Sequence, residues 1–287
     1  MTASGKISGT LHGDDGTSDE VEISGAKWSL HYLYNASKFA LRCAVDGDSV
    51  LWSCTARGRV TSWDEGDQKR SLVWSDSFDY LNTQDGFARS KELSLQYRGA
   101  KFEAEIEVLK VRRIDLSSST NEAVESPENA ACLVVEDQKV WVAKEVLSFH
   151  SPTFKDMFLS DSKAEVSYLL EDVKMEDFKL LLSVLYNLDI TINTKESLEG
   201  LLRLGAKYKS DLVLRFCHVI LSSPDKKFLP LETEIELCDR YGFFPILTKT
   251  IRSADLEELK EFAKGGYCAQ LSSFAHSLIG ERLVGST

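Results

Sequence analysis

Apolar and polar residues alternate one by one through much of the first third of the chain, and this pattern restricts the fold more than any other feature. In residues 102–108, apolar side chains alternate with Glu103, Glu105 and Glu107. The alternation places the apolar side chains on one face of a strand and the glutamates on its solvated face. Similar segments, separated by turn sequences rich in Asp and Gly, fall at 27–33, 38–45, 49–63, 69–78, 91–97 and 100–111. Several short strands spaced by turns predict an antiparallel β-sandwich.

The pattern changes after a polar segment at residues 115–128, which we interpret as an exposed linker. A predicted strand hairpin at 132–142 follows, and apolar residues then recur at helical spacing. Ser151 before Pro152 predicts a helix start, because a capping hydroxyl precedes a proline suited to the first helical position. Further helices are predicted from about residue 230 onward.

A second helix start is predicted near residue 193, where Asn193 and Glu196 have the spacing of a capping pair. Together these patterns predict an α+β protein of two domains: an antiparallel β-sandwich, then a mostly helical fold with a C-terminal helical extension. The predicted divisions are a flexible N-terminus at 1–20, the sandwich at 21–114, the linker at 115–128, the second domain at 129–222 and the extension at 223–287.

Composition excludes several kinds of partner. The net charge is −11, and the basic residues form no cluster larger than the short run at 108–113, so we expect no nucleic-acid partner. No apolar run is long enough to span a membrane, and the first residues lack the apolar core of a secretory signal. The six cysteines are dispersed among apolar neighbours, as expected for reduced thiols. We therefore expect an intracellular protein, cytoplasmic or nuclear, without a membrane partner.

Motifs that carry catalysis are absent from the sequence. It contains no nucleophile elbow, no phosphate-binding glycine loop and no zinc-protease motif. The five histidines are dispersed, and no cysteine pair completes a zinc site. We predict no catalytic residue, no cofactor and no metal. The alternative, a hydrolase in an unfamiliar fold, would need a convergent nucleophile and base, and the sequence offers no such set.

Residues 129–222 resemble the BTB/POZ domain. The stretch from Asn129 to Phe158 matches that family's opening of strand, turn, strand and helix. The matching positions are Val134, Val135, Val140, Val142, Lys144, Val146, Leu147, Ser151, Phe154, Met157 and Phe158. The resemblance implies a homodimer, with Val146, Leu147 and Phe149 at its interface. Asn129 and Ala143 depart from the family's usual Asp and His, which weakens the expected charged dimer pocket. The alternative is that the three apolar residues belong to the core.

The same resemblance implies a contact with a cullin-3 scaffold. The family uses a loop with an apolar residue, any residue and then glutamate, and here the corresponding sequence is Leu159-Ser160-Asp161. We therefore predict Phe158, Leu159 and Asp161 as the cullin contact, weakened by the shorter aspartate. The helices after residue 230 stand where relatives carry a helical extension that widens the cullin groove. The alternative for these helices is a packing cap on the domain core.

Residues 21–112 resemble a divergent MATH (TRAF-like) domain, and MATH followed by BTB is a pairing abundant in nematode proteins. The resemblance rests on the sequences AKWSLHY, WSCTARGRV, the triplet DGF and LSLQYRGAKFEAEIEVL. Relatives bind Ser/Thr-rich peptides in an aromatic groove whose positions correspond here to Arg42, Gly58, Ser77, Asp85 and Phe87. Among them the phenylalanine alone is retained, so a more polar groove for a basic or hydrogen-bonding ligand is expected. Asp76, Asp79 and Asp85 near the groove would favour such a ligand, and the alternative is that they are solvated turn residues.

These observations together predict a non-enzymatic adaptor. In this hypothesis the sandwich captures an unknown protein target, and the BTB domain dimerises and joins a cullin-3 ubiquitin ligase as its substrate receptor. The competing hypothesis is a homo-oligomeric BTB scaffold with no ligase role.

Overall fold

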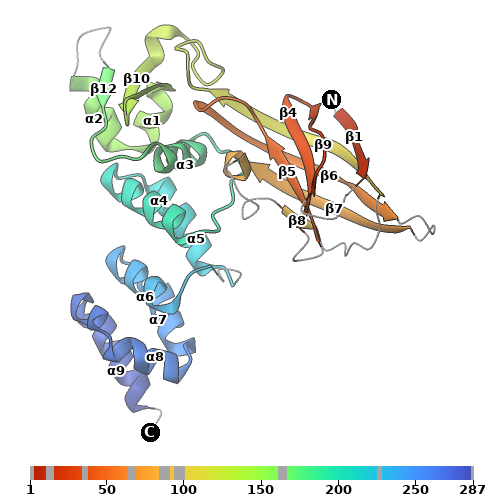
Figure 1. Ribbon diagram of the computed structural model, residues 1–287. Helices are drawn as coiled ribbons and strands as arrows, with labels where there is room; N and C mark the ends of the chain where they lie inside the picture. The colour runs from red at the N-terminus through yellow and green to blue at the C-terminus, as the bar shows by residue number, and fades with distance from the viewer. Residues whose placement is uncertain are drawn as a thin grey trace.

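The fold is described by a computed structural model covering residues 3–10, 16–33, 38–63, 69–83, 91–93, 101–160, 167–224 and 228–285. Figure 1 shows a two-layered β region on one side and a column of helices on the other, with α3 next to the β region. The predicted α+β class, with antiparallel sheets first and helices after, is confirmed. We call the first region the sandwich.

The sandwich consists of two antiparallel sheets. One sheet has the order β1-β9-β6-β7; the other has the order β2-β4-β5-β8, with β3 also paired to β4. The strands are β1 (Ala3–Thr10), β2 (Gly16–Thr17), β3 (Val21–Ile23), β4 (Ala26–Leu33), β5 (Lys38–Ala44), β6 (Val50–Trp63), β7 (Arg70–Asp79), β8 (Lys91–Leu93) and β9 (Lys101–Asp115), and a 3₁₀ helix, η2 (Tyr80–Thr83), follows β7.

Aromatic side chains join the two sheets face to face. Trp28 of β4 meets Phe78 of β7 with ring centroids 5.0 Å apart, and Phe39 of β5 lies 5.8 Å from Phe102 of β9. The alternation predicted for residues 102–108 is confirmed, because its apolar side chains are buried in this core. Its glutamates face outward, where Glu105 pairs with Lys6 at 2.9 Å. Edge-to-face aromatic contacts and apolar burial hold the sandwich together.

The N-terminus corrects one expectation. Residues 3–10, expected to be a flexible end, form β1 and pair antiparallel with β9 over their full length. Ile7 is the anchor, because its side chain is fully buried while its neighbours Lys6 and Ser8 are exposed. The strand escaped prediction because glycine and serine occupy half of its positions and carry little β-propensity.

The second region begins with a three-stranded sheet of order β11-β10-β12, in which β10 and β12 are parallel. Five helices follow or flank it. The elements are η4 (Pro127–Asn129), β10 (Ala130–Val135), β11 (Gln138–Ala143), α1 (Lys144–His150), α2 (Pro152–Ser160), β12 (Ser167–Leu169), α3 (Met175–Leu185), α4 (Lys195–Lys207) and α5 (Asp211–Ser222).

Both predicted helix starts can be compared with the structure. The Ser151 hydroxyl accepts a hydrogen bond from the Phe154 N–H at 3.1 Å, which confirms the capping role. The other prediction is wrong by one residue. Thr194, not Asn193, caps α4 by accepting from the Ser197 N–H at 3.2 Å.

The segment at 115–128 connects the two regions and is anchored at several points, although many of its side chains are exposed. The N–H of the buried Leu116 donates to the Ser49 carbonyl of the sandwich at 2.9 Å, and its carbonyl accepts from the Trp141 N–H of β11 at 2.8 Å. The buried Asn121 amide donates to the Trp141 carbonyl at 3.0 Å. The predicted linker is therefore exposed at about half of its positions but held in place, because backbone groups and a few apolar side chains tie the segment down.

The described residues from 228 onward form four α-helices, which make up the lower part of the column in Figure 1. They are α6 (Leu231–Arg240), α7 (Phe244–Ser253), α8 (Leu256–Lys264) and α9 (Ser273–Val284), with η5 (Gly266–Gln270) before the last. Asp239 of α6 accepts from the Ser272 N–H at 2.7 Å and so fixes the start of α9. Within the described ranges, no helix combines the length and apolar character required to cross a bilayer.

Candidate partner-docking site

Exposed leucines lie at two places in the second region, at the end of α2 and in β12. Leu159 is 73% exposed and Leu169 is 62% exposed. The residues that precede these leucines, Phe158 of α2 and Tyr168 of β12, contact each other with ring centroids 5.3 Å apart. Apolar side chains left this exposed are candidates for contact with another protein. We call Leu159 and Leu169 the α2–β12 patch.

A stack of aromatic rings holds this end of α2 in place. Phe154 is fully buried and stacks on Tyr208 at 4.3 Å and on Phe158 at 6.0 Å. Phe158, predicted as part of the cullin contact, is therefore half-buried in this stack, whereas Leu159 points out. The third predicted contact, Asp161, lies outside the described residues.

Leu169 was not predicted, although the sequence contains a signal for it. Residues 168–170 are consecutive apolar residues at the end of the short strand β12 and just after it. Successive side chains of a strand point to opposite faces, so such a run places apolar groups on both. Leu170 is buried and Leu169 faces outward.

A cavity of 510 Å³ lies where α5 ends and the C-terminal helices begin. Its lining comes from α5, α6 and α7 and includes Leu221, Leu231 and Ile246. Glu234 of α6 is buried at its edge and accepts a hydrogen bond from the Thr250 hydroxyl of α7, which satisfies the carboxylate. The C-terminal helices thus form one wall of a mainly apolar cavity instead of only covering the core.

The predicted dimer residues differ in exposure. Phe149 is 84% exposed at the end of α1 and lies edge-to-face against His150 at 4.9 Å, and Val146 is half-buried. Leu147 is fully buried, so it belongs to the core of its own chain and its assignment to a dimer surface is wrong. Burial, reinforced by the charge of Arg215, lowers the pKa of His150, which favours the neutral ring beside Phe149.

The residues predicted for a target groove are spread over both sheets. Arg42 lies on β5 between buried Leu41 and Cys43 and therefore faces away from the core. Ser77 lies on β7, in the other sheet, within 3.5 Å of the Thr55 hydroxyl. Asp85 and Phe87 lie outside the described residues. The described part of the sandwich thus does not place Arg42 and Ser77 on one sheet face.

Gly58, the remaining position, lies in a hollow of 910 Å³ on the four-stranded sheet. Arg57 and Arg59 flank the glycine, and Glu105 and Glu107 stand opposite on β9. Arg57 pairs with Glu107 at 2.6 Å, and this bond lowers the pKa of Glu107. In the lining of the hollow, Arg57 and Glu107 are therefore already paired, as are Lys6 and Glu105.

Metal-ligating side chains do not converge in the part of the chain that the structure describes: it contains no group of three His, Cys, Asp or Glu able to hold an ion.

Comparison with known proteins identifies one domain of the chain and several similar proteins. Residues 129–224 match the family model of the BTB/POZ domain. A BTB/POZ domain-containing protein of Caenorhabditis elegans is 31% identical over 159 residues, covering 54% of this chain and 49% of the relative. BTB and MATH domain-containing proteins 38 and 36 of the same organism are 28% and 26% identical, covering 62% and 84% of this chain and 49% and 80% of each relative. The chain thus spans about half the length of two of these relatives.

The chain carries a BTB/POZ domain behind a β-rich region consistent with a MATH-like domain, which confirms the predicted resemblance. Domains of this kind support a role in protein–protein interaction. From here we call residues 129–224 the BTB domain.

Proposed function

We propose that the protein is a non-catalytic adaptor that holds a target protein on its sandwich and joins a cullin-3 ubiquitin ligase through its BTB domain. The observation that carries the proposal is the α2–β12 patch, where two leucines are exposed on a rigid, aromatic-stacked base. Catalysis then belongs to the recruited machinery, and this chain raises the local concentration of the target.

The energetics of the patch fit a protein contact. Burial of one leucine side chain contributes roughly 1.5–3 kcal/mol. Two leucines therefore supply a useful part of the binding free energy of about −8 kcal/mol that corresponds to a micromolar Kd. Because Phe154, Phe158 and Tyr208 already fix the end of α2, little backbone ordering is needed there on binding. The 510 Å³ cavity beside α5 offers room for a second, apolar segment of the same partner.

Substitution of Leu159 tests the proposal. Leu159→Asp places a charge in the contact and is expected to abolish binding to a purified cullin-3 N-terminal region, measured by calorimetry. Val73→Asp is the matched control, because Val73 is 71% exposed on the sandwich, far in sequence from the patch. The control is expected to bind as the wild type does. Equal binding by both variants would move the contact elsewhere.

A second variant tests the weakened loop motif. Asp161→Glu restores the family's usual residue and is expected to tighten cullin-3 binding by about 1 kcal/mol, the order of one charge-assisted hydrogen bond. Wild-type protein that shows no binding up to about 100 μM, roughly −5.5 kcal/mol, would rule out the ligase role.

The alternative is a BTB scaffold that self-assembles without a ligase. Exposed Phe149 favours a homodimer under either function, so dimerisation does not separate the two. Cullin binding does, because the scaffold requires none.

A further inference from the structure

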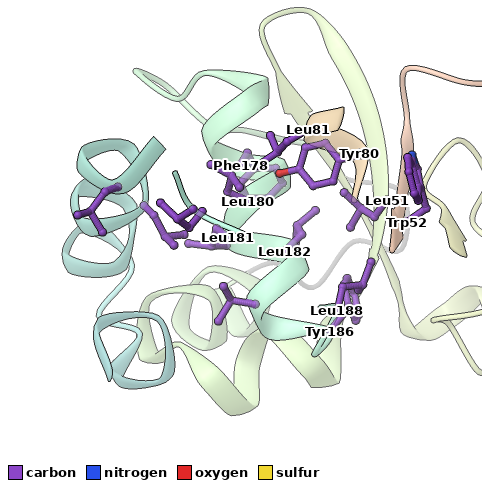
Figure 2. Close-up of a cluster of buried hydrophobic side chains, with 14 of the residues drawn as sticks. Leu51, Trp52, Tyr80, Leu81, Phe178, Leu180, Leu181, Leu182, Tyr186 and Leu188 are labelled. Carbon is purple, nitrogen blue, oxygen red and sulfur yellow. The ribbon is translucent and has the colours of Figure 1, made fainter. Parts of the chain in front are cut away.

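The boundary between the sandwich and the BTB domain has a shared apolar core. Tyr80 and Leu81 lie on η2, directly after β7, and both are buried. Figure 2 shows them beside Phe178 and Leu180 of α3, which are fully buried. Side chains from both regions are therefore buried in one apolar cluster. Interfaces between domains that move relative to each other are usually smaller and more polar than this one.

A lysine of the BTB domain is inserted into this boundary. Lys179 of α3 donates from Nζ to the Asp48 carbonyl of the sandwich at 3.1 Å. The same Nζ lies 4.7 Å from the centroid of the Tyr80 ring. Burial lowers the pKa of Lys179, which reflects the loss of water around the ammonium. The sandwich supplies both the acceptor and the aromatic face that replace this water.

A buried carboxylate is shared between the two regions. Asp79, at the end of β7, accepts from the Leu81 N–H at 3.0 Å and from the Thr191 N–H of the α3–α4 connection at 2.7 Å. Its neighbour across the sheet, Ser53, accepts from the Asp189 N–H at 3.3 Å. The Asp79 side chain is buried, so water does not solvate its charge. Separation of the two regions would therefore cost free energy, because the carboxylate would lose the hydrogen bond from the Thr191 N–H.

Two weaker groups of contacts border this centre. Lys110 of β9 pairs with Asp189 at 2.9 Å, and Arg112 donates to the Asn187 carbonyl. These exposed contacts add little energy but select one orientation. The Leu116 backbone, hydrogen-bonded to both Ser49 and Trp141, closes the other side.

We propose that these contacts make the sandwich and the BTB domain a single rigid body. Domains of one chain normally move relative to each other unless the interface between them is apolar and well bonded. Here the apolar core, the inserted Lys179 and the shared Asp79 all oppose that motion. If the proposed function holds, a target on the sandwich is carried at a fixed angle to the α2–β12 patch. The rigidity itself does not depend on that function.

Amide hydrogen exchange of the full chain tests the proposal directly. The N–H groups of Asp189 and Thr191 bond only across the boundary among their described contacts, so their exchange reports its opening. We expect the protection factors of both N–H groups to lie within about 10-fold of that of the Tyr186 N–H, which is bonded inside the BTB domain. Exchange as fast as that of an exposed turn would overturn the proposal.

A variant sharpens the measurement. Asp79→Asn weakens the acceptor of the Thr191 N–H and is expected to raise its exchange rate at least about 10-fold. Asp46→Asn is the control, because Asp46 is an exposed carboxylate of the sandwich that pairs with Lys27. If Asp79→Asn fails to fold, the wild-type exchange rates still decide. Neither readout involves a cullin or a target, so failure of the rigid joint and failure of the ligase role are distinguished.

Discussion

The carboxylate of Asp177 fills the space beside Gly200, where α3 and α4 meet. A methyl group at position 200 would lie 2.1 Å from Asp177 Oδ1. The other carboxylate oxygen pairs with Arg203 at 2.9 Å, and Arg203 also donates to the Asp172 carbonyl at 2.8 Å. The glycine therefore permits a partly buried ion pair between the two helices.

Gly200→Ala is expected to destabilise the protein. Alanine improves helix propensity by about 1 kcal/mol, but it forces the Asp177 carboxylate out of its place, and overpacking costs about 1–3 kcal/mol in addition to the strained ion pair. Gly280→Ala is the control, since no atom lies within 4 Å of the added methyl in α9, and it is expected to stabilise by about 0.5–1 kcal/mol. Urea unfolding measures both, and shifts in the same direction would contradict the argument.

Ser151→Ala is expected to cost about 1–2 kcal/mol in the free energy of unfolding, because it removes the cap of the Phe154 N–H. The hydroxyl also donates to the Tyr208 carbonyl, which would lose its partner. Ser210 precedes α5 in the same way, but its buried hydroxyl has no described partner. Ser210→Ala should therefore be close to neutral. An equal loss in both variants would show that the cap contributes nothing.

Much of the sandwich was predictable because its strands obey a simple rule. Alternation along β9 specified which side chains enter the core, and the structure agrees at Phe102, Ala104 and Ile106. The rule fails for β1, where glycine and serine leave Ile7 as its one large apolar side chain. Pairing with β9 stabilises that strand, and backbone pairing with a distant segment leaves no trace in local sequence.

The exposure of the proposed docking residues was predictable in part. Position in the sequence identified Leu159, but it did not separate Leu147 from Phe149, since a seven-residue helix is too short for its periodicity to define one face. The anchoring of the segment at 115–128 was missed for another reason. It depends on Leu116 and Val124 among polar residues and on backbone hydrogen bonds that composition does not report.

Substitutions in α1 are expected to separate dimerisation from folding. Phe149→Asp changes an exposed side chain, so the protein should stay folded and become monomeric in light scattering. Leu147→Asp places a charge in the core and should instead unfold the domain, a loss of more than about 4 kcal/mol. Circular dichroism checks the fold of each variant. A folded dimer for Phe149→Asp would remove α1 from the interface.

Stability at mildly acidic pH is expected to depend on His31. This buried histidine of β4 lies 2.9 Å from the Thr17 hydroxyl through Nδ1 and 3.1 Å from the Ser29 hydroxyl through Nε2. Burial, assisted by the charge of Arg42, lowers the pKa of His31, and the opposite effect of Glu20 is smaller. The folded state therefore favours the neutral ring.

The sign follows from proton linkage. Because the pKa is lower in the folded than in the unfolded state, the unfolded state binds the proton first as the pH falls below about 6.5. The stability contribution of neutral His31 is thus present above that pH and is lost as the pH falls toward the folded pKa, by at most about 1.4 kcal/mol per pH unit. Urea unfolding at about pH 7.5 and about pH 5.5 should show this loss in the wild type and a smaller one in His31→Asn. His276→Asn, on the exposed face of α9, controls for removal of a histidine, and a loss that is equal in wild type and His31→Asn would exclude His31 as its source.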